Sequence, residues 1–122
     1  MAYPLQEEDA LAVGMAAFIA RAHANSTNKG FWEGVALPEM TPDIKASKIA
    51  LMHSELSEML EGVRKPGQDS HCPEFTSEEI ELADLFIRGA DYAGARRLRL
   101  VEAIRAKMRF NESRPYKHGK AI

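Results

Sequence analysis

Residues 48–66, KIALMHSELSEMLEGVRKP, decide the fold because their apolar side chains recur at intervals of three and four residues. That spacing puts the apolar side chains on one face of a helix, whereas a strand would alternate polar and apolar residues. The same spacing recurs elsewhere in the chain, and no run alternates with period two for long enough to indicate a sheet. We therefore predict an all-α fold.

Helix start and stop signals divide the chain into four expected helices. Thr41 is a good N-cap, and Pro42 suits the first position of the helix that follows it. Thr76 and Glu79, three residues apart, form a capping box for the next helix. Gly94 is expected to interrupt that helix. The four expected helices cover about residues 7–24, 42–64, 77–93 and 98–112.

The chain has 122 residues, which predicts a single domain over 1–122 that ends in a basic tail at 113–122. Hydrophobic residues make up 45% and charged residues 28%, as in ordinary globular proteins. A core built from so short a chain is modest, so self-association is a natural way to bury more surface.

Several absences narrow the class of protein. No apolar stretch approaches the roughly 18–20 residues of a membrane span, so no membrane protein is expected. The single Cys72 cannot form an internal disulfide, and the first residues do not resemble a secretion signal, so a cytoplasmic protein is expected. The net charge of −2 argues against general nucleic-acid binding. Charge is nevertheless unevenly distributed, because the charged residues within 1–87 are mostly acidic and those within 88–122 are mostly basic.

Two pairs of acidic residues carry the strongest chemical signal. Glu55 and Glu58 lie three residues apart in one expected helix, and Glu81 and Asp84 repeat that spacing in the next. A helical projection puts each pair at the edge of an apolar face, where carboxylates lose solvation and require compensation. With no cysteine or histidine in register, this oxygen donor set predicts Mg²⁺ or Mn²⁺. The alternative interpretation is a pair of solvated helix faces.

The last expected helix has a polar, cationic stripe. Lys107, Asn111 and Arg114 follow one another at i, i+4 and i+7, and Lys117 comes shortly after them. Lysine and arginine beside a metal site are suited to a polyphosphate. A basic helix end favoured by the helix dipole is the alternative. Trp32, in an expected loop, is either a stacking surface for a nucleobase or a core residue.

Four stretches resemble the MazG-like nucleoside triphosphate pyrophosphohydrolases, in the small single-domain branch of the all-α NTP pyrophosphatases. The resemblance spans about residues 25–120, and the acidic motifs together with the C-terminal motif make it specific. The stretches are NKGFW at 28–32, KIALMHSELSEMLEGVRKP at 48–66, EEIELADLFIRGADYAG at 78–94 and KMRFNESRPYKHGK at 107–120.

The resemblance implies a helical bundle that forms a homodimer or homotetramer, and hydrolysis of a nucleoside triphosphate to monophosphate and pyrophosphate. The physiological role it implies is cleansing or control of the nucleotide pool. It also implies which residues do the work. Glu55 is the candidate for accepting the proton of the attacking water, because it is the one acid set within the apolar arc of its helix. The Mg²⁺ ligands and catalytic residues would be Glu55, Glu58, Glu81 and Asp84, and the substrate-binding residues Lys107, Asn111, Arg114, Lys117 and Trp32.

Three alternatives remain open on the sequence. A dUTP or dUDP pyrophosphatase of the same superfamily would share the acidic pairs, but such enzymes are usually longer. A di-iron carboxylate bundle would need histidine where Glu58 and Asp84 stand, so redox iron is disfavoured. A non-catalytic helical module would keep its acidic stripe solvated and bind an acidic partner through its basic end.

Overall fold

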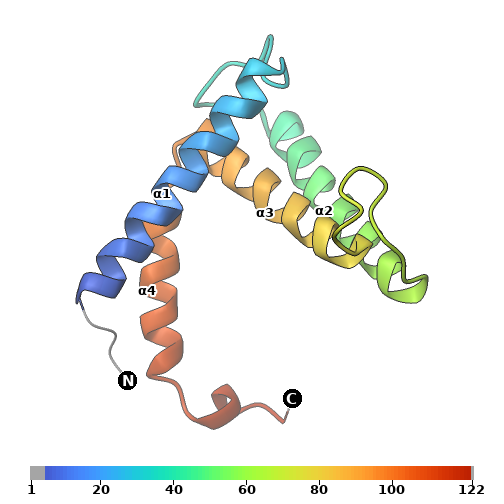
Figure 1. Cartoon of the computed structure of the whole chain (residues 1–122). Coiled ribbons are helices and arrows are strands. Elements are labelled where there is room, and N and C mark those ends of the chain that lie inside the picture. The colour runs from blue at the N-terminus through green and yellow to red at the C-terminus, as the bar shows by residue number, and fades with distance from the viewer. Residues whose placement is uncertain (1–4, 122) are drawn as a thin grey trace.

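The computed structural model describes residues 5–121, and within them all regular structure is helical (Figure 1). One isolated bridge between Gln68 and Thr76 is the only β-type pairing in this part of the chain. The all-α prediction and the number of helices are confirmed. The helices are α1 (Leu5–Asn28), α2 (Pro42–Arg64), α3 (Ser77–Arg96) and α4 (Leu100–Glu112), followed by a short 3₁₀-helix, η1 (Tyr116–Gly119).

Both predicted helix caps are present. The Thr41 hydroxyl accepts a hydrogen bond from the amide of Ile44 at 3.3 Å, at the start of α2. At the start of α3 the Thr76 hydroxyl accepts from the Glu79 amide at 3.1 Å, and the Glu79 carboxylate accepts from the Thr76 amide at 3.0 Å. These local contacts fix where the two acid-bearing helices begin.

The predicted break at Gly94 is wrong, because α3 continues through this residue to Arg96. A Cβ atom at Gly94 would lie 2.8 Å from the Cβ of His23, closer than such atoms approach. The glycine therefore allows α1 and α3 to cross closely. The helix ends instead at Arg97, whose left-handed backbone (φ 53°) closes it. The first helix is also longer than predicted, ending at Asn28 rather than near residue 24.

The four helices form an open bundle with α3 at its centre. α2 packs along α3, α1 crosses α3, and α4 packs more lightly against α1. Figure 1 shows α3 between α1 and α2, with α4 running back beside α1 and away from α2. This arrangement separates the acid-bearing pair, α2 and α3, from the basic end of the chain.

The buried core is small, and much apolar surface stays exposed. Trp32, Met40 and Ala95 form the buried centre. By contrast Leu60 on α2 and Phe86 on α3 are each 61% exposed. The apolar faces that the sequence predicts for these helices are therefore only partly covered within one chain. None of the helices in residues 5–121 is long and apolar enough to cross a membrane.

Candidate metal centre

Three of the four predicted ligands meet where α2 packs against α3. Carboxylate oxygens of Glu55, Glu81 and Asp84 all lie within 4.8 Å of one another. The spacing of three residues places Glu81 and Asp84 on the same face of α3, and Glu55 faces them from α2. This is the geometry needed for several oxygens to share one hard cation.

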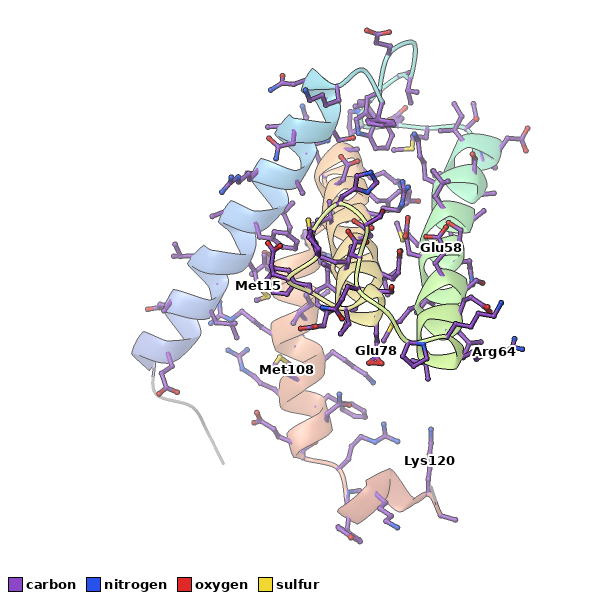
Figure 2. All side chains as sticks on the ribbon, turned by 45° about the vertical axis from the view of Figure 1, so that its right-hand side comes forward. Met15, Glu58, Arg64, Glu78, Met108 and Lys120 are labelled. Carbon is purple, nitrogen blue, oxygen red and sulfur yellow. The ribbon has the colours of Figure 1, made fainter. Side chains whose placement is uncertain are left out.

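Glu58, the fourth predicted ligand, lies beside this group but not within it. Its side chain is exposed on α2 (Figure 2). Its charge and its hydrogen bonding nevertheless contribute to the raised pKa of Glu81, so the two carboxyl groups are neighbours. Glu58 is thus placed to act at the margin of the cluster.

Glu55 is the most deeply buried member of the cluster, with only 6% of its surface exposed. Nε of Arg88 donates a hydrogen bond to its Oε1 at 2.7 Å. Its other oxygen, Oε2, is buried with no hydrogen-bond partner in the described residues, and so is Oε2 of Glu81. Buried carboxylate oxygens without partners are costly, so both atoms are suited to accept a cation.

The proximity of the acids changes their pKa values in opposite directions. Burial, together with Glu55 and Glu58, raises the pKa of Glu81 to about 8. Burial and the charge of Glu55 likewise raise the pKa of Asp84. Burial would also raise the pKa of Glu55, but Arg88, Glu81 and Glu58 together outweigh it and hold this pKa below its usual range. The cluster therefore holds a proton near neutral pH, which a divalent cation would replace.

The cluster borders a cavity of about 690 Å³ between α1, α2 and α3. This volume lies within the roughly 300–1,000 Å³ of small-molecule sites. Glu55 and Asp84 line it, and Trp32 forms part of its wall. The predicted metal ligands thus lie beside a space large enough for a nucleotide.

Trp32 is 6% exposed and is held on several sides. Its Nε1 donates to Oδ1 of Asp91 at 2.9 Å, and the same oxygen is 2.9 Å from Nδ1 of His23. Nζ of Lys48 lies 4.4 Å from the centre of the indole ring. Phe31, which precedes Trp32 in the chain and is 64% exposed, also lines the cavity. Trp32 therefore shapes the wall, while Phe31 offers more free aromatic surface.

The predicted cationic stripe of α4 is not brought to this cavity by its own chain. Lys107, Asn111 and Arg114 do not line it, and Lys107 and Arg114 lie over the ring of Phe110 instead. Lys117 lies over Tyr116 in the tail. Figure 2 shows the tail beyond the end of α4, with Lys120 apart from Glu58 on α2. Within one chain, acids and stripe therefore occupy separate places.

Sequence reasoning missed the basic residues that do line the cavity. Arg88 pairs with Glu55 across 33 residues, which no local pattern reveals. Lys48 donates to the Phe31 carbonyl at 3.3 Å besides lying over Trp32. Arg21 and Lys29 line the cavity from the side of α1. Their i, i+8 spacing was a readable signal, because it resembles the stripe recognised near the C-terminus.

Comparison with protein-family models, with curated proteins and with solved structures gives no match to this chain.

Proposed function

We propose that this protein is a Mg²⁺-dependent nucleoside triphosphate pyrophosphohydrolase that converts NTP or dNTP to the monophosphate and pyrophosphate. One observation carries the proposal. The cluster of Glu55, Glu81 and Asp84 borders a cavity of nucleotide size, and two of its buried oxygens have no hydrogen-bond partner within residues 5–121. The donor set fits Mg²⁺ because it contains only carboxylate oxygens, with Mn²⁺ as the natural substitute.

In this proposal Glu55, Glu81 and Asp84 hold the ion, and Glu58 supports it from the margin. When bound, Mg²⁺ supplies charge neutralisation on the phosphates and makes water easier to deprotonate. Glu55 is the candidate to accept the proton of the attacking water, since it is the most deeply buried acid of the cluster and its lowered pKa keeps it ionised. Arg88 fixes the orientation of this carboxylate through its 2.7 Å hydrogen bond. The chain thereby contributes positioning and a base rather than a covalent nucleophile.

The substrate's aromatic base would enter between the exposed ring of Phe31 and the wall that Trp32 builds. The stripe of Lys107, Asn111 and Arg114, with Lys117, would reach the phosphates of a site only from a second copy of the chain. Extensive exposed apolar surface supports such a homodimer or homotetramer, because a monomer rarely leaves large apolar patches in water. A role in cleansing or control of the nucleotide pool is compatible with this site.

The test is a pyrophosphate-release screen with canonical, deoxy and modified triphosphates in millimolar Mg²⁺ or Mn²⁺. We expect metal-dependent release that chelation abolishes. The control is Glu61→Gln, an exposed acid on α2 that pairs only with Arg64 and Lys65 in the described residues. If no triphosphate releases pyrophosphate with either metal, the hydrolase proposal fails. Release of pyrophosphate from dUTP alone would favour the dUTP pyrophosphatase alternative.

One observation favours a non-catalytic interaction module as the second candidate. Arg88 already neutralises Glu55, so the cluster has a resident cation without any metal. Calorimetric titration with Mg²⁺ and Mn²⁺ separates the two functions. Measurable binding that Asp84→Asn weakens supports the hydrolase, and a complete absence of divalent-cation binding supports the module.

A further inference from the structure

The cavity beside the acidic cluster has a second polar wall, formed by the C-terminal half of α1 and by Lys29, the residue that follows it. Arg21, Asn25 and Lys29 line it at i, i+4 and i+8. Helical spacing puts Arg21 and Asn25 on one face of α1, and Lys29 lines the same space directly after the helix ends. One cavity therefore has carboxylates on α2 and α3 and cations on α1 and directly after it.

Four basic side chains line this cavity, and they differ in what they already contact. Arg88 is paired with Glu55, and Lys48 is bound to the Phe31 carbonyl and lies over Trp32. The side chains of Arg21 and Lys29, which are both exposed, have no hydrogen bond, ion pair or ring contact in the described residues. Their donors are the ones left for a ligand that enters from solvent.

We propose that Arg21 and Lys29, with the amide of Asn25 between them, bind the terminal phosphates of the nucleoside triphosphate. This assignment rests on the proposed function and deepens it by naming the anion-binding wall within the chain. Guanidinium and ammonium groups form charge-assisted hydrogen bonds to phosphate oxygens. The α4 stripe cannot bind these phosphates within one chain, because it does not line the cavity.

The wall has a defined task in the hydrolysis. Water oxygen forms a bond to the α-phosphorus while the bond from that phosphorus to the bridging oxygen breaks. The electron pair of the broken bond stays on the pyrophosphate, and the water gives up its proton to a carboxylate. Negative charge therefore grows on the β and γ phosphates, where Arg21 and Lys29 would stabilise it.

The experiment measures anion binding rather than turnover, with tripolyphosphate as the probe. The full chain is titrated in millimolar Mg²⁺ by calorimetry and by the fluorescence of Trp32, the single tryptophan. We expect the dissociation constant to rise about tenfold for Arg21→Ala and for Lys29→Ala, and further for the double variant. Arg21→Lys should retain most of the binding.

Arg64→Ala is the matched control, because it removes one positive charge from an exposed end of α2 outside the cavity. Unchanged helicity and melting temperature will show that the variants fold. The proposal is overturned if the wild type does not bind tripolyphosphate, or if the double variant binds it as the wild type does.

The two proposals fail separately. Should the wild type bind tripolyphosphate through Arg21 and Lys29 but release no pyrophosphate from any triphosphate, the hydrolase proposal falls and the anion wall stands. Should the protein hydrolyse triphosphates while the double variant binds tripolyphosphate normally, the anion wall falls and the hydrolase stands.

Discussion

Two helices carry similar cationic stripes, but the two stripes lie in different surroundings. On α1 and directly after it, Arg21, Asn25 and Lys29 line the cavity next to the carboxylates. On α4, Lys107 and Arg114 lie over Phe110, on a helix that packs mainly against α1. Spacing along a helix determines which residues share a face, but only tertiary packing determines what that face meets. A cationic stripe therefore identifies a phosphate site only after its partner helix is known.

The comparison of the two stripes depends on the carboxylates being the reaction centre. We expect Glu55→Gln and Asp84→Asn each to lower pyrophosphate release by roughly 100-fold or more, because metal binding supplies several kcal/mol of transition-state stabilisation. Steady-state assays of both variants beside Glu61→Gln measure this. Near-normal rates in the two variants would remove the acidic cluster from the chemistry.

Mixing two variants in one oligomer tests whether each stripe acts at the carboxylates of its own chain or at those of a second copy. Inactive Asp84→Asn chains are refolded with chains that carry Lys107→Ala and Arg114→Ala. A stripe that acts across a subunit boundary restores one intact site in each mixed dimer, about a quarter of wild-type activity for a random mixture.

A mixture of Asp84→Asn chains with chains that carry both Arg21→Ala and Lys29→Ala should restore no activity. The α1 wall and the carboxylates that it serves belong to one chain, so each mixed dimer would contain two defective sites. Restoration by both mixtures would show that α1 also acts across the boundary, and restoration by neither would place α4 outside the site.

The close crossing of α1 and α3 positions the α1 wall, and Gly94 makes it possible. We expect Gly94→Ala to destabilise the protein by roughly 1–3 kcal/mol, because the new methyl group would meet His23. Tripolyphosphate binding should weaken as α1 is displaced. Gly89→Ala is the control within α3, since nothing lies within 4 Å of the position a Cβ would take.

Gly89→Ala should instead raise stability by about 0.5–1 kcal/mol through better helix propensity. Chemical denaturation of both variants measures the difference. A destabilised Gly89→Ala together with an unaffected Gly94→Ala would contradict the close crossing.

The raised pKa of Glu81 makes the stability of the folded protein depend on pH. Its pKa lies at about 8 against an ordinary value of 4.5, so between these pH values the folded chain holds a proton that the unfolded chain has released. The metal-free protein should therefore lose stability as pH rises through this window. Glu81→Gln should raise its melting temperature by a few degrees near pH 8 and abolish the further rise on adding Mg²⁺.

Thermal melts across pH 5–9, with and without Mg²⁺, check this behaviour. A wild-type melting temperature that stays flat over this range without metal would contradict the raised pKa of Glu81. A rise with Mg²⁺ that persists in Glu81→Gln would exclude this residue as a ligand.

The sequence predicts well those features that depend on contacts between residues close together in the chain. The caps at Thr41 and Thr76 involve side chains and amides within three residues, so the starts of α2 and α3 are readable. The acid pairs are readable because helical spacing alone puts their members on one face. The meeting of Glu55 with Glu81 follows once two adjacent helices pack through those faces.

What the sequence does not predict depends on contacts between distant residues. Gly94 reads as a helix break, yet it serves the approach of His23, 71 residues away. The pairing of Arg88 with Glu55 has no local signature. The direction of α4 depends on the turn at Arg97, whose left-handed backbone no residue preference predicts.

The most direct test of the central claim identifies the products by ³¹P NMR during incubation of the protein with a susceptible triphosphate and Mg²⁺. The proposal predicts monophosphate and pyrophosphate in equal amounts, lost on chelation and in Asp84→Asn. Diphosphate with inorganic phosphate, or equal product formation by Asp84→Asn, would contradict it.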